Sequence, residues 1–440
     1  MLSTWRRRGS STRCAAIALS SRWKCDLFIA VRTPLQNPFR PGSDVIPDVW
    51  AGRVDQLSDW RDVLRPRLLA GGYERGRTIL GEPGTGKSSL VIKIARDAAG
   101  DGDWVTPQLR VPSGADPLKL VAEAVVKLAD KAGLRASTRG RVLDLIGRVE
   151  QLAISGWSVS VRQAEGPEPY RALFELLVEV GEAAIRQWNV VFIHVDEVQN
   201  ITDDAALSQL LIAFGDALSH KVVVTPPGGE PTERHLPIAV YLTGLPDFGD
   251  MAQGRTGATF SRRFATTVLA AIDEEDLRAA LQPFVIDGWE VADALGGSET
   301  VRMEQTAVDA IVNLCCGEPF LFQLAGQRAW NAGTTSTITE ADALRGWRSA
   351  ENEAAAHVER VLGRLPTREN EFVIAMAELT PRDRTATKIA HALGFTLASQ
   401  IGPSSRRLDT VRGIITRGKP CSFRNRAVEA YLTTDWPNTD

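Results

Sequence analysis

Residues 81–88 read Gly-Glu-Pro-Gly-Thr-Gly-Lys-Ser and match the pattern G-x-x-x-x-G-K-[ST] at every fixed position. The glycines let successive backbone N–H groups turn inward around a phosphate, which side chains at those positions would block. Lys87 can supply a cation to the terminal phosphates, and the Ser88 hydroxyl can ligate Mg²⁺. The predicted contacts to a nucleoside triphosphate are Gly81, Glu82, Pro83, Gly84, Thr85, Gly86, Lys87, Ser88 and Ser89.

The segments on either side of this loop fit a strand–loop–helix unit. Thr78 to Leu80 is a short apolar run and reads as a buried strand, and a helix is expected from Ser88 to Gly100. The N-terminus of that helix directs partial positive charge at the phosphates. We therefore predict an ATP site with Mg²⁺ here, in preference to a glycine-rich surface loop.

A second apolar run, residues 190–195, ends in the carboxylates Asp196 and Glu197. A strand buried on both faces needs such a run. Asp196 suits the metal, and Glu197 suits polarising a water for in-line attack on the γ-phosphate. A buried strand that merely ends in an acidic turn is the alternative, but it loses weight after a phosphate loop. His194 is expected to pack inside the sheet without a catalytic role.

Two later segments carry weaker signals. Thr243 ends the next expected strand, so its hydroxyl could touch the γ-phosphate or the water, although an ordinary turn threonine fits equally well. Arg262 and Arg263 precede the last expected strand and could stabilise transition-state charge in a neighbouring subunit. The alternative for these arginines is a solvated basic pair.

The composition is that of a globular protein with two or three domains. The chain has 440 residues, of which 44% are hydrophobic and 24% charged, and no apolar run approaches the length of a membrane span. Its five cysteines, two of them adjacent, form neither a disulfide framework nor a C-x-x-C metal pattern. A reducing cytoplasm is therefore expected.

Charge is distributed unevenly. Residues 1–40 carry eight Lys or Arg against one acidic residue, and residues 361–440 carry twelve against eight, although the net charge is −3. The middle of the chain is therefore acidic, and any nucleic-acid contact is expected at the ends. The apolar stretch of residues 14–19 is too short for a secretion signal, so residues 1–36 are predicted to be a disordered basic arm or translated sequence upstream of the true start.

Alternating strand and helix signals predict an α/β domain with a parallel sheet over residues 37–272. Strands are expected at 77–81, 105–111, 189–195, 237–243 and 265–270; helices at 117–133, 140–152 and 168–187; a further strand or hairpin at 157–161; and an exposed loop at 226–231. After residue 272 strand signals stop, and helices at 273–282, 304–315, 318–331 and 339–362 predict a helical domain, residues 273–364, before a third region, residues 365–440.

The order of these motifs resembles the AAA+ ATPases over residues 37–436. The similarity is to the bacterial and archaeal branch that includes initiator (origin-recognition) ATPases and STAND signalling ATPases. The resemblance implies an α/β P-loop NTPase domain, a helical lid and a C-terminal winged helix. It also implies that Pro47 to Arg53 flank the adenine, that Thr243 is sensor 1, that Arg262 or Arg263 is the arginine finger, and that ATP drives homo-oligomer formation.

The lid motif departs from the initiator pattern. Initiator-type ATPases place an arginine where Phe320 lies, whereas Gly317-x-Pro319 follows the STAND form, with Pro319 at the nucleotide. The loss of that arginine puts coupling between hydrolysis and lid movement in doubt. Slow turnover, with ATP and ADP acting as a switch, is the expectation.

The C-terminal region resembles a winged helix, with helices near 367–378, 385–394 and 404–416 followed by a strand-like tail. Between residues 380 and 426 there are ten basic residues and two acidic ones, which favours phosphate contact. The expected DNA contacts are Arg406, Arg407, Arg412, Lys419 and Arg424. The alternative is that this region packs on the ATPase or holds a partner protein.

Two functions follow. The first is an ATP-controlled, DNA-associated regulator of the replication-initiator, transposition or plasmid-maintenance type. The second is a STAND-like signalling or defence switch whose output is a partner protein. No protease or nuclease constellation is visible in the sequence, so a separately encoded effector is expected under either hypothesis.

Overall fold

The computed structural model describes residues 31–131, 169–225, 228–256, 262–292 and 297–439. The predicted helix at 140–152, the predicted strand at 157–161 and part of the predicted loop at 226–231 lie outside these ranges. Within them, no helix is long and apolar enough to cross a membrane.

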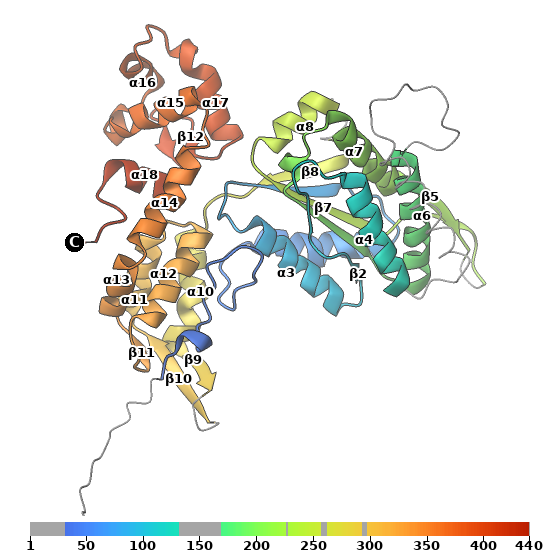
Figure 1. Ribbon diagram of the computed structural model, residues 1–440, viewed down its shortest axis with the longest axis horizontal. Helices are drawn as coiled ribbons and strands as arrows, with labels where there is room; N and C mark the ends of the chain where they lie inside the picture. Colours follow the sequence, from blue (N-terminus) through green and yellow to red (C-terminus); the bar gives the residue numbers. More distant parts are fainter. Residues whose placement is uncertain (1–30, 132–168, 226–227, 257–261, 293–296, 440) are drawn as a thin grey trace, which may run out of the picture.

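A parallel sheet forms the centre of the first domain (Figure 1). Its strand order is β2-β4-β7-β1-β8, and β3 also pairs with β4. The five strands predicted within the described ranges all form, although the one expected at 105–111 is split in two. Their bounds are β1 Gly76–Leu80, β2 Trp104–Val105, β3 Leu109–Arg110, β4 Val191–Asp196, β7 Ile238–Gly244 and β8 Phe264–Val268. The predicted α/β architecture is therefore confirmed.

Alternate residues of the central strands belong to different apolar clusters, as expected for a sheet covered on both faces. Ile193 of β4 packs in the cluster formed with α4, α6 and α7, whereas Phe192 packs in the cluster formed with α3. The helices are α1 Val54–Ser58, α2 Arg65–Leu69, α3 Lys87–Gly100, α4 Pro117–Lys131, α6 Pro169–Gln187, α7 Asp204–Ser219 and α8 Phe248–Thr256. We call residues 54–268 the sheet domain.

The lid, residues 274–362, is mostly helical but also contains a small sheet that the sequence did not predict. Its helices are α10 Glu274–Ile286, α11 Gln305–Leu314, α12 Pro319–Asn331, α13 Glu340–Arg348 and α14 Glu351–Leu362. The strands β9 Trp289–Ala292, β10 Ser298–Met303 and β11 Thr337–Ile338 pair in the order β11-β10-β9. A second unpredicted pair, β5 Lys221–Val224 and β6 Thr232–His235, forms a hairpin in the sheet domain.

The N-terminal segment, residues 31–53, packs on the lid. The Arg32 side chain is buried and donates a hydrogen bond of 2.9 Å to Asp342. Phe39 stacks on Phe284 at 5.7 Å between ring centroids. The expectation of a disordered arm up to residue 36 is therefore wrong for residues 31–36, because their contacts lie in a distant part of the chain.

The C-terminal unit, residues 365–439, continues the lid. Its apolar side chains, among them Leu365, Phe372 and Val428, belong to the same buried cluster as those of α11 and α12. Figure 1 shows lid and C-terminal unit as one elongated body beside the sheet domain. The elements of the unit are α15 Thr367–Ala377, α16 Ala386–Ala392, α17 Gly402–Thr410, β12 Ile415–Thr416, β13 Ser422–Phe423 and α18 Arg426–Thr433. Three helices and a strand pair thus form in the predicted order, and their assignment as a winged helix stays a prediction.

Candidate nucleotide site

The loop between β1 and α3 has the backbone shape that its glycines predict. Gly84 and Gly86 adopt φ angles of +84° and +80°, which L side chains rarely adopt. A Cβ atom on Gly84 would lie 2.4 Å from Cε1 of His357, so α14 of the lid also packs directly on this loop. The helix α3 begins at Lys87, directly after Gly86.

The Lys87 ammonium group is held at the loop by backbone carbonyls. Its Nζ atom donates to the carbonyl oxygens of Gly81 at 2.9 Å and Glu82 at 3.0 Å. Burial lowers the pKa of Lys87, and the carboxylates of Glu197, Glu82 and Asp196 offset only part of that effect. A half-buried cation that backbone carbonyls hold in place is well suited to receive an anionic ligand.

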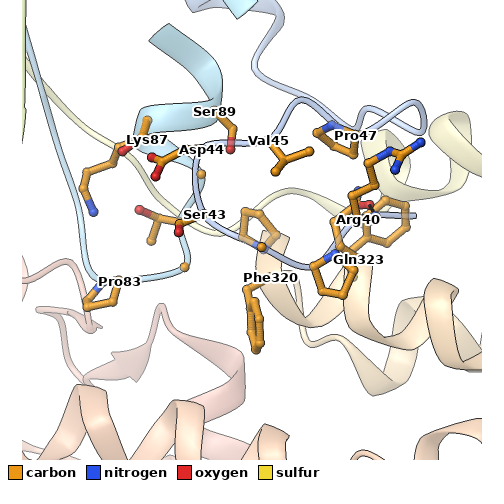
Figure 2. Close-up of a pocket in the computed structure, with 18 of the residues that line it drawn as sticks. Arg40, Ser43, Asp44, Val45, Pro47, Pro83, Lys87, Ser89, Phe320 and Gln323 are labelled. Atoms are coloured by element: carbon orange, nitrogen blue, oxygen red, sulfur yellow. Dashed lines mark hydrogen bonds between the residues drawn. The ribbon is translucent and has the colours of Figure 1, made fainter. Parts of the chain in front are cut away.

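A cavity of about 410 Å³ opens beside this loop, within the range usual for small-molecule sites. It is lined by the phosphate loop, the N-terminal segment and the helices α12 and α14. Figure 2 shows Lys87 and Pro83 at one end, and Arg40, Pro47 and Gln323 at the other. The elongated outline suits a ligand with phosphates at one end and a base at the other.

Asp196, at the end of β4, is a buried carboxylate with many hydrogen-bond donors. Its Oδ2 atom accepts from Ser88 Oγ at 3.0 Å and from Gln108, and its Oδ1 atom accepts from Thr243 and from the Glu197 N–H. Burial alone would raise the pKa of Asp196, but these hydrogen bonds hold it below the usual value. The side chain is therefore ionised at neutral pH.

Ser88 and Asp196 are the pair that could hold Mg²⁺. A hydroxyl and a carboxylate are the oxygen ligands that this ion prefers, together with the phosphates of a nucleotide. In the described ranges, no group of three or more His, Cys, Asp or Glu side chains could hold a metal ion by itself. The donor set therefore fits an ion shared with a nucleotide.

Glu197 lies beside this pair and lines the same cavity as Lys87 and Ser88. Its backbone adopts φ +58°, an uncommon angle for a residue other than glycine. Gln199 donates a hydrogen bond to the Glu197 carboxylate and accepts one of 3.1 Å from the Leu245 N–H. Gln199 therefore connects Glu197 to the end of β7. Neither Gln199 nor Gln108 was predicted, since a single glutamine outside a recognisable motif does not indicate a functional site.

The hydroxyl of Thr243 was expected near the γ-phosphate or the attacking water, and in the structure it contacts two side chains of the neighbouring strand. Thr243 is fully buried, its hydroxyl donates to Asp196, and its oxygen lies 3.0 Å from His194 Nε2. Because the hydroxyl hydrogen is used by Asp196, Thr243 accepts from His194. Burial lowers the pKa of His194 to about 4, which keeps the ring neutral. Thr243 thus orients the carboxylate and is not among the side chains that line the cavity, and its contact with a γ-phosphate or the attacking water stays a prediction.

The lid side of the cavity is formed by Pro319 and Phe320. Pro319 is the first residue of α12 and lies near Gly86, and the Phe320 N–H donates to the Gly84 carbonyl at 3.2 Å. His357 stacks on Phe320 at 5.0 Å, and burial lowers its pKa to about 4. Its contact with the loop was not predicted, because nothing local to α14 indicates it.

The N-terminal segment reaches the loop through Arg53. Its guanidinium donates to the backbone carbonyls of Thr85 at 3.1 Å and Ala270 at 2.8 Å. Burial lowers the pKa of Arg53 to about 10, although three nearby carboxylates oppose the change. The segment from Pro47 to Arg53, expected to flank the adenine, thus contributes four side chains to the cavity, Pro47, Trp50, Ala51 and Arg53.

The two arginines expected to act on a neighbouring subunit differ. Arg263 forms an ion pair of 2.8 Å with Asp216 and donates to the Ile212 carbonyl, so it is engaged with α7 of its own chain. Arg262 is exposed. The preceding Phe260 and Ser261 lie outside the described residues.

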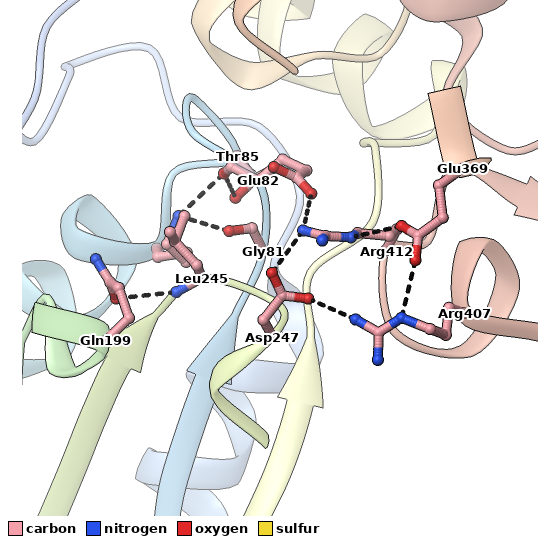
Figure 3. A network of polar contacts seen from close by, with 10 residues as sticks. Gly81, Glu82, Thr85, Gln199, Leu245, Asp247, Glu369, Arg407 and Arg412 are labelled. Atoms are coloured by element: carbon pink, nitrogen blue, oxygen red, sulfur yellow. Dashed lines mark hydrogen bonds and ion pairs between the residues drawn. The ribbon is translucent and has the colours of Figure 1, made fainter. Parts of the chain in front are cut away.

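The five arginine and lysine residues predicted to contact DNA also separate into groups. Arg406 and Lys419 are exposed, whereas Arg424 forms an ion pair of 2.7 Å with Asp409. Arg407 and Arg412 are turned toward the sheet domain and pair with carboxylates there (Figure 3). In this arrangement neither of the last two is free to contact a DNA phosphate, contrary to the expectation from the basic composition.

No protein-family model and no curated protein matches the sequence. Among solved structures, the ORC2 protein of Aeropyrum pernix in ADPNP–ADP complexes is similar, with 16% identity, a TM-score of 0.50 and coverage of 89% of this chain and 95% of that chain. The Walker-type ATPase PABY2304 of Pyrococcus abyssi has 15% identity and a TM-score of 0.51, covering 88% and 96% of the two chains. At this identity the likeness shows the fold. The chain therefore shares the fold of these proteins, an α/β P-loop NTPase domain followed by a helical lid.

Proposed function

We propose that this protein binds ATP with Mg²⁺ in the cavity between sheet domain and lid, and hydrolyses it to ADP and phosphate in the cytoplasm. The observation that carries this proposal is the Ser88–Asp196 contact of 3.0 Å. It joins the phosphate loop to the end of β4, where Glu197 enters the same cavity. A metal-binding pair, a phosphate cradle and a candidate base therefore converge at one place.

Binding rests on the loop and on Lys87. The inward amides of residues 84–88 and the N-terminus of α3 receive the phosphates, and Lys87 contacts the β- and γ-phosphates. Ser88 and Asp196 would hold Mg²⁺, which would neutralise part of the phosphate charge. Pro47, Pro319 and the neighbouring side chains enclose the base and the ribose.

Hydrolysis rests on Glu197. Its carboxylate accepts a proton from the attacking water as the water oxygen bonds to the γ-phosphorus, and the bond to the β–γ bridging oxygen breaks to release ADP. Gln199 positions Glu197, and Thr243 positions Asp196. Arg262 of an adjoining copy in an ATP-dependent homo-oligomer would supply charge to the transition state.

The experiment that tests binding is a titration of ATP with Lys87→Ala. We expect the Kd for ATP to rise at least about 100-fold, because a charge-assisted contact to two phosphates is lost. Arg96→Ala is the matched control, since Arg96 lies on the same helix, is exposed and does not line the cavity. Equal affinity of the wild type and Lys87→Ala would contradict the proposal.

For the output we propose an ATP-controlled association with DNA through the C-terminal unit. The candidate contacts are Arg406 and Lys419, which are exposed and have no ion-pair partner among the described residues. The double variant Arg406→Ala/Lys419→Ala should lower the slope of log affinity against log salt by about 2. Arg171→Ala/Arg186→Ala on α6 removes the same charge from exposed positions elsewhere and should leave the slope unchanged.

A second output is favoured by the docking of Arg407 and Arg412 on the sheet domain. A basic unit that packs on its own ATPase fits a STAND-like switch, whose output would be a separately encoded effector protein. DNA binding that is unaffected by the double variant would favour this second function over the first.

A further inference from the structure

The second residue of the phosphate loop, Glu82, has a buried carboxylate that faces the C-terminal unit. Its side chain is 7% exposed, and its Oε1 atom has no hydrogen-bond partner among the described residues. Arg412 forms an ion pair with this oxygen, at 3.8 Å from its Nη1 atom. An incompletely paired carboxylate inside the loop that receives phosphates needs an explanation.

Arg412 lies just after α17 and connects three parts of the chain. Its Nη1 atom is 2.8 Å from Asp247 at the start of α8, and its Nε atom donates to Glu369 of α15 at 3.2 Å. The Arg412 side chain is 5% exposed. Figure 3 shows its guanidinium between the carboxylates of Glu82, Asp247 and Glu369.

Arg407 completes the network from α17. It pairs with Glu369 at 2.8 Å, with Asp250 at 2.8 Å and with Asp247 at 3.1 Å. Two guanidinium groups therefore face four carboxylates. We call these six residues the latch: Glu82, Asp247, Asp250, Glu369, Arg407 and Arg412.

Charges on the C-terminal unit and at the end of the lid act on the phosphate loop. Burial raises the pKa of Glu82, and the charges of Arg412, Arg364 and Lys87 oppose the rise. Arg364, just after α14, also acts on the Lys87 ammonium group. Cations from the lid end and the C-terminal unit thus act on the groups that would surround a terminal phosphate.

The contact between the C-terminal unit and the sheet domain is ionic. Among the described residues, the buried apolar side chains of the C-terminal unit cluster with the lid, and those of the sheet domain form two other clusters. Burial of charge without apolar packing gives little net stability, so small changes of local charge can shift the docking equilibrium.

We propose that the latch reads the occupant of the phosphate loop, with Arg412 as a positioning residue that docks the C-terminal unit more tightly when a triphosphate is bound than when a diphosphate is bound. The inference rests on the proposed binding of ATP. A γ-phosphate adds negative charge next to Glu82 and Lys87, and attraction to Arg412 stabilises the docked arrangement. By linkage, docking must then favour ATP over ADP by the same factor.

Docking also has a consequence for the predicted DNA contacts. Arg407 and Arg412 cannot pair with the latch carboxylates and with DNA phosphates at the same time. Triphosphate binding therefore withdraws these two arginines from DNA, and conversion to ADP releases them.

The test is to titrate wild type, Arg412→Gln and Arg412→Lys with a non-hydrolysable ATP analogue and with ADP, in the presence of Mg²⁺. In Arg412→Gln the Kd for the analogue should rise about 5- to 20-fold, the size of a usual coupling between sites, while the Kd for ADP changes less than about twofold. Arg412→Lys keeps the charge and should restore most of the analogue affinity. Arg382→Gln removes one charge from an exposed position of the same unit and should change neither Kd.

The proposal would be overturned if Arg412→Gln lost affinity equally for both nucleotides, or for neither. Either result would leave the proposed binding of ATP intact. A wild type that binds neither nucleotide would instead contradict the proposed function. If Arg412→Gln does not fold because the buried carboxylates of Glu82 and Glu369 lose a cation, Arg412→Gln/Glu369→Gln removes one of those charges as well, and the same ratio of affinities decides.

Discussion

Two regions of the molecule bury carboxylates in contrasting ways. At the carboxyl edge of the sheet, Asp196 accepts hydrogen bonds from neighbouring side chains of the same domain, and its pKa stays below the usual value. At the contact between the lid and its neighbours, Glu318 is buried, and Asn425 donates a hydrogen bond of 2.8 Å to its carboxylate. Burial there raises the pKa of Glu318 to about 7, although Arg53 opposes it.

The difference separates a preorganised site from a responsive one. At the edge, Asp196 is ionised because hydrogen-bond donors on adjacent strands and on the phosphate loop stabilise its charge. Its ionisation should therefore change little with pH or salt. Glu318, Glu82 and the latch depend on how the lid and C-terminal unit meet the sheet domain. Their charges are incompletely compensated, so pH, salt and ligand charge can all shift that contact.

The largest expected effect concerns Glu318. Its folded-state pKa of about 7 lies above the usual 4.5, so its contribution to stability is present below pH 4.5 and is lost as pH rises through 7. The loss reaches about 3 kcal/mol in the free energy of unfolding by pH 8. Glu318→Gln should remove this dependence in urea unfolding measured from pH 5 to pH 8.

Asp196 has the opposite sign, because its pKa is lowered and its contribution is lost only as pH falls below the usual carboxyl range. It should therefore add no slope above pH 5. If the free energy of unfolding depended on pH in the same way in the wild type and in Glu318→Gln, the contact between the lid and its neighbours would not be the responsive region.

Thr243→Val tests the preorganised edge. The variant keeps the shape of the side chain but leaves Asp196 without one donor and His194 without its acceptor. We expect ATP hydrolysis to fall about 10- to 100-fold, and the Mg²⁺ concentration for half-maximal rate to rise, because the loss acts through Asp196, the proposed ligand of the metal. An unchanged Mg²⁺ dependence with a slower rate would place Thr243 at the phosphate instead.

The smallest expected effect is that of Arg407→Ala. Its side chain is 39% exposed, so solvent screens its ion pairs and the free energy of unfolding should fall by less than about 1 kcal/mol. The loss should shrink as NaCl is raised, since the pairs are screened in the wild type too. Arg382→Ala serves as the control. A large, salt-independent loss would mean that the contact is held by packing and not by charge.

The contrast also separates what the sequence predicts from what it does not. The phosphate loop, the end of β4 and the order of the motifs along the chain were predictable, because each motif depends on a local run of residues. Thr243 was placed at the right strand end, but the direction of its hydroxyl depends on Asp196 and His194 in the neighbouring strand.

Contacts between distant segments left no such signal. The basic residues of the C-terminal unit indicated an anionic partner, and for Arg407 and Arg412 that partner is a set of carboxylates in the same chain. Arg32 likewise looked like part of a basic arm, yet it pairs with Asp342. The strands of the lid were missed because they are short, β9 with four residues and β11 with two, and lie between longer helical segments.

The central claim is that Glu197 is the base of an ATP-hydrolysing site, and the most direct measurement is single-turnover hydrolysis by Glu197→Gln. The variant keeps the size of the side chain and its contact with Gln199 but cannot accept the proton. Hydrolysis should slow at least about 100-fold while the Kd for ATP stays within about threefold, so that ATP accumulates on the protein. Hydrolysis at the wild-type rate in this variant would contradict the assignment.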